Sequence, residues 1–147
     1  MRKTGMGLAT LGVALVAAAC GGKGEKAGGS GGEAKLEVSA DPSALAFHET
    51  ALKAAPGQAI VVEFKNPSQL PHTWVLVAPG DEEKVDQSAQ PTGAVDGVAG
   101  VIKASGVVNG GSSETIQVGA LEPGTYSFIC TFPGHLAAGM KGTLTVQ

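Results

Sequence analysis

The chain has 147 residues, and its ten lysine and arginine residues against thirteen aspartate and glutamate residues give a formal net charge of −3. This mild acidity argues against nucleic acid as a partner, because proteins that bind nucleic acid gather positive charge on the binding face. The length and composition are those of one domain with a modest hydrophobic core.

The first 20 residues are typical of a bacterial signal peptide. Arg2 and Lys3 precede an uncharged, mostly apolar run over residues 6–19, which is too short to cross a bilayer as a transmembrane stalk. The end of the run, VAAAC, resembles a bacterial lipobox, although Ala17 stands where a large aliphatic residue is usual. We therefore predict a lipoprotein-type signal peptide over residues 1–19 and lipidation of Cys20. Plain secretion, with Cys20 trimmed away, is the alternative.

A glycine-rich segment follows the cysteine. Residues 21–34 are half glycine and have no apolar side chain larger than alanine, so burial cannot offset the entropy of ordering them. We predict that residues 20–34 form a lipidated cysteine and a flexible tether, which holds a folded domain near a membrane and lets it turn. Loss of Arg2 and Lys3 with the signal peptide leaves eight basic and thirteen acidic residues, a net charge of −5.

Residues 35–147 are predicted to form an all-β domain. Ile60, Val62 and Phe64 alternate with other residues and so share one face of a strand. Turn signals such as Ala-Pro-Gly and Asn-Gly-Gly separate short runs of this kind, which is typical of a two-sheet sandwich. The predicted strands are 36–40, a stretch near 47–54, 59–65, 72–77, 115–118, 125–130 and 141–147. The segment 81–106 fits less well; it is predicted to be an excursion with a short helix opening at residues 81–84.

Cysteine and methionine are scarce in the predicted mature chain. Cys130 is then the only cysteine apart from Cys20, and Met140 is the only methionine. No disulfide within the domain is available to Cys130, which is unusual for a small exported protein. A lone thiol in an oxidising compartment is a liability unless something holds it, and a metal ion would do so.

The phase of the predicted strands directs three metal-binding side chains inward. His72, Cys130 and Met140 are each an even number of residues from apolar residues of their own strand, and side chains an even number apart share a face. His135 lies in the loop between the last two predicted strands. Two imidazoles and a thiolate with a weak methionine ligand are the donor set of a blue copper electron-transfer site. Zinc rarely takes methionine, and a catalytic zinc needs an open position.

The segment GTYSFICTFPGH, residues 124–135, followed by MKGTLTV, residues 140–146, closely resembles the copper-binding hairpin of azurins and of auracyanins, which are blue copper proteins of the cupredoxin family. The resemblance implies a Greek-key β-sandwich of about eight strands. It also implies one type 1 copper ion held by His72, Cys130, His135 and Met140. Four residues separate His135 from Met140, as in auracyanins. Relatives commonly have asparagine after the upstream histidine, where this chain has Thr73, whose hydroxyl can still bridge the two ligand loops.

The expected function is that of a membrane-tethered one-electron carrier in a respiratory or photosynthetic chain, with no enzymatic activity. Expected partners are membrane-bound or soluble redox proteins, with donors and acceptors of the cytochrome or reaction-centre type. The chain is expected to be a monomer, anchored by its lipid to the outer, periplasmic face of the cytoplasmic membrane. A copper chaperone or buffer is one alternative. A copper enzyme is another, but it would need additional histidines, and this chain has three and no His-x-His pair.

The loop around His135 is rich in apolar residues, and we expect the exposed edge of this ring to be where electrons enter and leave. An apolar patch is predicted around it, because contiguous exposed apolar surface usually marks a contact site. The predicted members of the patch are Leu70, Pro71, Pro133, Leu136, Ala137 and Ala138.

Overall fold

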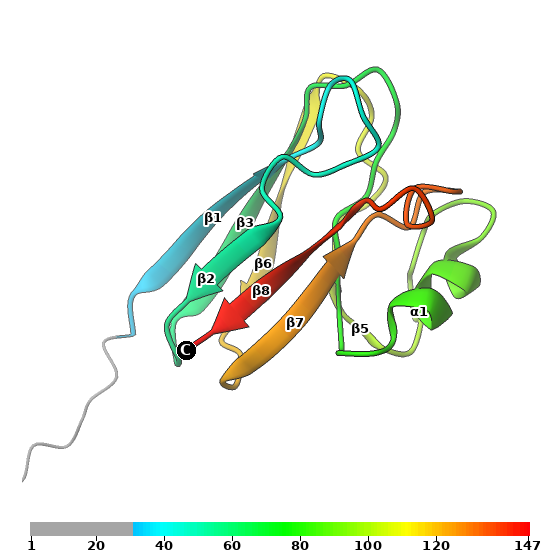
Figure 1. Ribbon diagram of the computed structural model, residues 1–147. Helices are drawn as coiled ribbons and strands as arrows, with labels where there is room; N and C mark the ends of the chain where they lie inside the picture. The colour runs from blue at the N-terminus through cyan, green and yellow to red at the C-terminus, as the bar shows by residue number, and fades with distance from the viewer. Residues whose placement is uncertain (1–30) are drawn as a thin grey trace, which may run out of the picture.

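The computed structural model describes residues 31–147, which form two β-sheets packed face to face with one helix beside them (Figure 1). The predicted signal peptide, Cys20 and most of the predicted tether lie outside the described residues. The three-stranded sheet contains, in order, β1 (Glu33–Ser39), β3 (Ala59–Asn66) and β6 (Ser112–Gly119). The five-stranded sheet contains, in order, β2 (Ala51–Ala54), β8 (Lys141–Val146), β7 (Gly124–Ile129), β4 (Val75–Val77) and β5 (Val101–Ala104).

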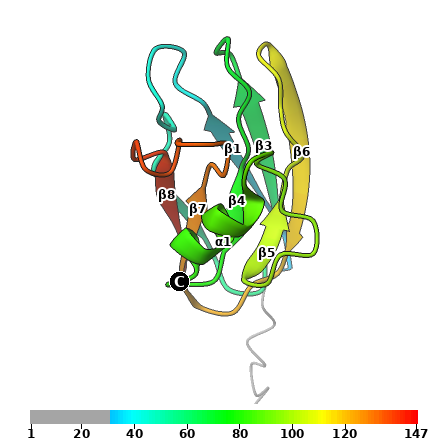
Figure 2. The same ribbon diagram turned by 90° about the vertical axis from the view of Figure 1, so that its right-hand side faces the viewer.

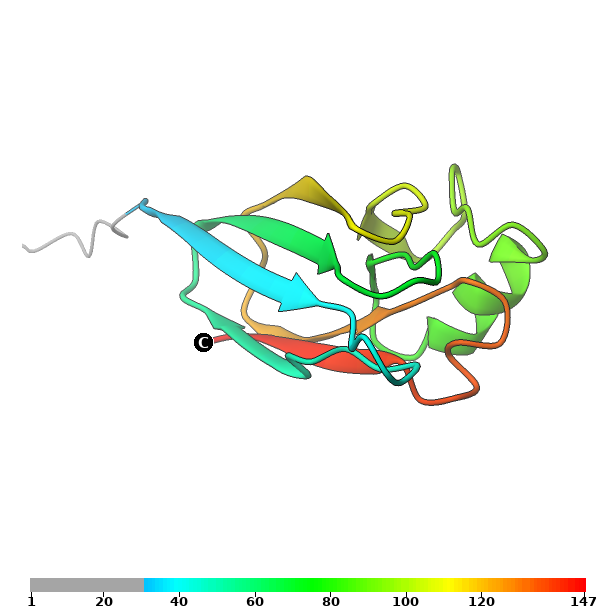
Figure 3. The same ribbon diagram turned by 90° about the horizontal axis from the view of Figure 1, so that it is seen from above.

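The chain passes repeatedly from one sheet to the other. β1 pairs in parallel with β3 in the three-stranded sheet. β2, which lies between them in the sequence, belongs to the five-stranded sheet and pairs in parallel with β8. Figure 3 shows the two sheets as separate layers. The predicted all-β Greek-key sandwich with about eight strands is confirmed over residues 31–147. None of the helical structure in this range has the length and apolar character that a membrane crossing requires.

The main core lies between the sheets and is built from the alternating faces of the strands. Ile60, Val62 and Phe64 of β3 are fully buried, as their period-two pattern predicted. Trp74 stacks on Phe128 with 5.7 Å between ring centroids, so it is a packing residue of the core. Packing between the sheets therefore positions Trp74 and, with it, the two residues that precede it, His72 and Thr73.

A second, smaller core lies on the outer side of the five-stranded sheet. Helix α1 (Glu82–Ala89) covers β4 and β7 there, as Figure 2 shows, and buries Val85 and Ala89 against them. All three residues of β4 are buried, because this strand has the main core on one face and α1 on the other. The short helix predicted within the 81–106 excursion is thus confirmed, and it serves to cover the sheet.

The sequence prediction missed one strand and placed several strand ends differently from the structure, as at β2, β4 and β6. β5, which pairs with β4, was not predicted. Its four residues are mostly half-buried and show no strict alternation, so they lack the signal that identifies a strand. β1 begins at Glu33, two residues before the predicted start of the domain.

Candidate metal centre

Strand register brings three of the predicted metal ligands to one end of the five-stranded sheet. The first residue of β4, Val75, pairs with the last residue of β7, Ile129, and Ile129 also pairs with the first residue of β8, Lys141. His72 precedes β4, Cys130 follows β7 and Met140 precedes β8. The three side chains therefore lie next to neighbouring strand ends at one end of the five-stranded sheet.

The donor atoms of His72, Cys130 and His135 face one another. The two Nδ1 atoms are 3.1 Å apart, and the Cys130 Sγ atom is 3.3 Å from His135 Nδ1 and 3.8 Å from His72 Nδ1. First-row metal ions bind imidazole nitrogen and thiolate sulfur at about 2.0–2.3 Å, so ligands in a trigonal plane are separated by about 3.5–3.7 Å. The triangle thus has the size and the donor types to hold one copper-sized ion.

Met140 lies beside this triangle and helps to close the loop that carries His135. It is fully buried, and its carbonyl accepts a hydrogen bond of 3.1 Å from the Cys130 N–H while its own N–H donates to the His135 carbonyl at 3.0 Å. Gly134 and Gly139 have φ angles of +81° and +99°, which side-chain-bearing residues rarely adopt, so they allow the loop to turn this tightly. All four predicted ligands are therefore gathered at one end of the sandwich, and their roles as ligands stay a prediction.

A network of polar side chains fixes the ring of His72. The Ser68 hydroxyl uses its single proton toward Asn66, so in its 3.0 Å contact with His72 Nε2 the ring nitrogen is the donor. Ser68 in turn donates to Asn66 Oδ1 at 2.8 Å, and Asn66 Nδ2 donates to the carbonyls of Leu70 and Val108. Metal-binding histidines are commonly held through their second nitrogen in this way. The sequence did not point to Ser68 or Asn66, because Asn-Pro-Ser reads simply as a turn.

Two threonines join the loops that carry His72 and Cys130. The Thr73 hydroxyl lies 2.9 Å from the Thr131 hydroxyl and accepts a hydrogen bond of 2.8 Å from the Thr131 N–H. The Thr73 N–H donates to Cys130 Sγ at 3.3 Å. The bridge expected from Thr73 is therefore present, and Thr131 is its partner, which the sequence analysis had not identified.

Burial governs the protonation of the donor groups. It lowers the pKa of His72 to about 4, with a smaller contribution from repulsion by His135, and it also lowers the pKa of His135. Both imidazoles are thus neutral near neutral pH, as a metal ligand must be. Burial raises the pKa of the Cys130 thiol, which hydrogen bonds from the Thr73 and Phe132 N–H groups partly oppose. Metal binding must therefore displace the thiol proton.

The apolar patch predicted around His135 is present only in part. Pro133, Ala137 and Ala138 are exposed, and Leu70 is 51 % exposed. Leu136 is only 6 % exposed and packs in the smaller core with Val85, so its predicted place in the patch was wrong. The sequence could not show this, because the predicted short helix had no assigned position over the loop.

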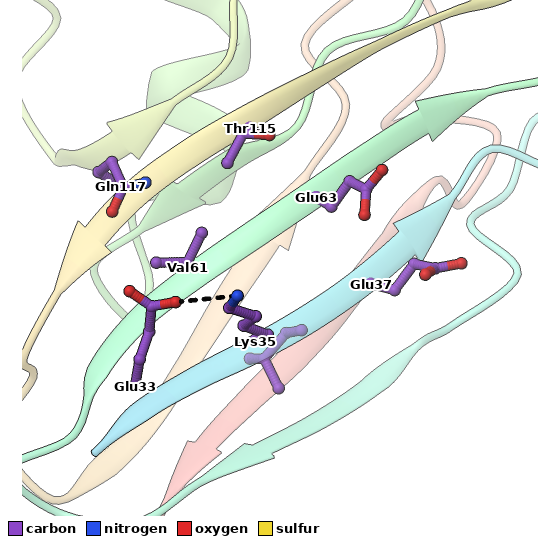
Figure 4. Close-up of a pocket in the computed structure, with 8 residues that line it drawn as sticks. Glu33, Lys35, Glu37, Val61, Glu63, Thr115 and Gln117 are labelled. Atoms are coloured by element: carbon purple, nitrogen blue, oxygen red, sulfur yellow. Dashed lines mark ion pairs between the residues drawn. The ribbon is translucent and has the colours of Figure 1, made fainter.

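The outer face of the three-stranded sheet carries a shallow hollow of about 480 Å³, which includes none of the predicted metal ligands in its lining (Figure 4). It is lined by side chains that alternate outward from β1, β3 and β6, such as Lys35, Glu63 and Gln117. Lys35 pairs with Glu33 at 3.6 Å, and both side chains are well exposed. This surface is a solvated sheet face, and its lining contains no histidine or cysteine. Exposed ion pairs such as that between Lys35 and Glu33 contribute little to the stability of the fold.

The chain is similar to known proteins in both sequence and structure. The pattern of the family described as copper binding proteins, plastocyanin/azurin family, matches residues 34–147. Auracyanin-A of Chloroflexus aurantiacus is 34 % identical over 150 residues, covering 92 % of this chain and 91 % of that protein. Auracyanin-B of the same organism is 37 % identical over 120 residues, covering 76 % of this chain; the match spans about half, 51 %, of auracyanin-B.

Among solved structures, the dithionite-reduced auracyanin of Roseiflexus castenholzii superposes with a TM-score of 0.72 and 37 % identity, covering 80 % of this chain and 99 % of that chain. An azurin from Methylomonas sp. strain J superposes with a TM-score of 0.70 at 20 % identity, a likeness of fold alone.

Proposed function

Because the chain belongs to the plastocyanin/azurin family of copper-binding proteins, we propose that it carries single electrons between redox proteins of a respiratory or photosynthetic chain. A bound copper ion supplies the one-electron couple. We propose His72, Cys130 and His135 as its equatorial ligands and Met140 as a weak axial ligand. The observation that carries the proposal is the triangle of two imidazole nitrogens and one thiol sulfur, 3.1–3.8 Å apart and buried.

The residues around the triangle favour electron transfer over chemistry on a substrate. The donor atoms are held by strand ends, by Ser68 and by the Thr73–Thr131 bridge, so they need to move little when the charge of the site changes. The three donor residues are at most 5 % exposed, which leaves little room for a substrate to reach the ligands. We therefore propose no catalytic role. Stable, reversible cycling between the two oxidation states would distinguish a carrier from a copper chaperone or buffer.

We propose that electrons pass through the ring of His135, which is 5 % exposed, by way of the docking patch formed by Leu70, Pro133, Ala137 and Ala138. These residues are exposed and surround the end of the sandwich that carries the ligands. Transient redox contacts are small, so one charge at their centre can weaken them. Leu70 is the best place for this charge because its side chain is apolar, large and 51 % exposed.

Electron self-exchange between oxidised and reduced copies of the protein tests this docking patch without a known partner. Leu70→Lys is expected to slow self-exchange at least several-fold, because it places like charges opposite each other, while the absorption spectrum stays the same. Gln117→Lys is the matched control, since it adds the same charge to the exposed outer face of β6 (Figure 4). If both variants slow exchange equally, or if only the control does, electrons do not pass through this patch.

We also propose that the protein is exported and held at the outer face of the cytoplasmic membrane by a lipid on Cys20. The sequence of residues 1–34 supports this, and β1 begins at Glu33, so the predicted tether runs directly into the first strand. Mass spectrometry of the mature N-terminus, with membrane fractionation, tests it. An acylated Cys20 at the N-terminus and release from membranes on Cys20→Ser are expected. An unmodified terminus beyond residue 20 would disprove the anchor.

A further inference from the structure

We propose that Thr131, acting with the Gly93 carbonyl, keeps the hydroxyl proton of Thr73 away from the Cys130 sulfur and thereby lowers the reduction potential of the site. The inference rests on the proposed copper function and adds a positioning role for two residues that are not themselves ligands. Thr131 and Gly93 belong to different segments, the loop after β7 and the loop after α1.

The two hydroxyl groups lie in a buried chain of close contacts. Thr73 Oγ1 is 2.8 Å from the Thr131 backbone nitrogen, 2.9 Å from Thr131 Oγ1 and 3.7 Å from Cys130 Sγ. Thr131 Oγ1 is 2.6 Å from the Gly93 carbonyl oxygen. Thr73 and Thr131 are 1 % and 0 % exposed, so bulk water does not compete for their protons.

Counting protons gives each contact a direction. A threonine hydroxyl has one proton to donate, and a carbonyl oxygen can only accept. The 2.6 Å contact therefore uses the proton of Thr131, which leaves Thr131 Oγ1 as an acceptor. The Thr73 hydroxyl, whose oxygen already accepts from the Thr131 N–H, then donates to Thr131 Oγ1. The Cys130 sulfur is the other acceptor within reach of the Thr73 hydroxyl, but at 3.7 Å its contact is the longest of the set, so the proton goes to the nearer oxygen.

This direction matters because the sulfur is sensitive to each additional hydrogen bond. Backbone N–H groups of Thr73 and Phe132 act on it already. A further donor would stabilise the state with more negative charge on sulfur, which is the reduced state, and so would raise the reduction potential. The arrangement of Thr131 and Gly93 withholds that donor.

The loop after α1 holds the Gly93 carbonyl in place. Gln90 Nε2 donates to the Thr131 carbonyl at 3.2 Å, which ties the two loops together beside Gly93. A Cβ atom on Gly93 would lie 3.1 Å from Phe132 Cα, and the φ angle of Gly93 is +78°. Glycine is thus the residue that lets this carbonyl approach Thr131, and the helical excursion gains a connection to the proposed copper site.

Three variants in the copper-loaded protein test the inference. Thr131→Val keeps the shape but removes the acceptor, so the Thr73 hydroxyl turns to Cys130 Sγ. The reduction potential is expected to rise and the sulfur-to-copper absorption band to move to shorter wavelength. Thr73→Val also removes the acceptor of the Thr131 N–H, so it serves as the reference for the double variant. Adding Thr131→Val to Thr73→Val is expected to change neither quantity, because no Thr73 hydroxyl is left to turn. Thr131→Ser, which keeps the hydroxyl, is the control and is expected to match wild type.

Two outcomes overturn the inference: an unchanged or lowered potential in Thr131→Val, or a rise on Thr131→Val that is equally large when Thr73 is already valine, which would mean that the Thr73 hydroxyl does not cause it. If wild type lacks the absorption band, the copper function itself fails. If the valine variants do not fold, proton NMR of the metal-free wild type decides. A cross-peak between the Thr73 and Thr131 hydroxyl protons supports the inference, whereas one from the Thr73 hydroxyl proton to the Cys130 β-protons contradicts it.

Discussion

His72 depends on one hydroxyl group for the orientation of its ring. Its Nε2 donates to Ser68, which is 5 % exposed and is held in turn by Asn66. Without that acceptor the ring could rotate, or a buried N–H would lose its partner at a cost of about 1–3 kcal/mol. The Ser68 hydroxyl therefore holds Nδ1 toward the other donors.

Ser68→Ala is expected to weaken copper binding by about 10–100-fold, the usual effect of removing the group that holds a ligating histidine. Competition with a chelator of known affinity measures this. Ser112→Ala, at an exposed serine, is the control and should bind copper as wild type does. An unchanged affinity in Ser68→Ala would show that the ring is held by packing alone.

The sequence predicted single residues well where strand phase decides their direction. His72, Cys130 and Met140 point inward as the apolar residues of their strands required. Ser68, Thr131 and Gly93 could not be identified, because their roles depend on loops that meet only in the folded chain. Thr131 and Gly93 are 38 residues apart, and no local pattern links them.

At the level of elements, α1 packs against the loop that carries His135. Leu136 reaches from this loop into the smaller core, where Val85 and Ala89 of the helix cover it. The predicted strands were confirmed where alternation was regular, as in β3, whereas the position of α1 follows from tertiary packing that alternation does not report. For the same reason the burial of Leu136 was not predicted.

Leu136→Ala is expected to lower the free energy of unfolding by about 2–4 kcal/mol, because it leaves a cavity between the loop and α1. Chemical denaturation of the metal-free protein measures it. The neighbouring exposed Ala137 supplies the control: Ala137→Lys should stay within about 0.5 kcal/mol of wild type. Equal, small effects would mean that Leu136 does not pack under the helix.

Helix α1 is also linked to β7 by a hydrogen bond from the Ser127 hydroxyl to the Glu82 carboxylate. This bond is the largest cause of the lowered pKa of Glu82. A carboxyl group whose pKa is lower in the folded state stabilises the fold above its unfolded pKa, about 4.3, and loses that contribution as the pH falls through its folded pKa.

Ser127→Ala is therefore expected to lower the free energy of unfolding by about 1 kcal/mol at pH 7, an amount limited by the partial exposure of the pair. The difference from wild type should shrink as the pH falls below about 4. Denaturation at several pH values checks this, with the exposed Ser113→Ala as control. A difference that stays constant with pH would show that the effect of the substitution does not depend on the ionisation of Glu82.

For the whole molecule, the first strand begins at the end opposite the proposed copper site. β1 runs parallel to β3 from the pair Glu33–Ala59 to the pair Ser39–Lys65, and β3 ends just before the loop that carries His72. Figures 1 and 3 show the chain entering β1 at one end and the loop between β7 and β8 at the other. A lipid tether at this entry would leave the docking patch free to meet a partner.

Optical absorption of the Cu(II)-loaded domain tests most directly whether Cys130, His72 and His135 together bind one redox-active copper ion. Wild type is expected to bind one copper per chain with an intense visible band from the thiolate, which disappears on reduction and returns on oxidation. Cys130→Ser should lose this band altogether. A colourless wild-type protein, or an equally coloured Cys130→Ser variant, would contradict the claim.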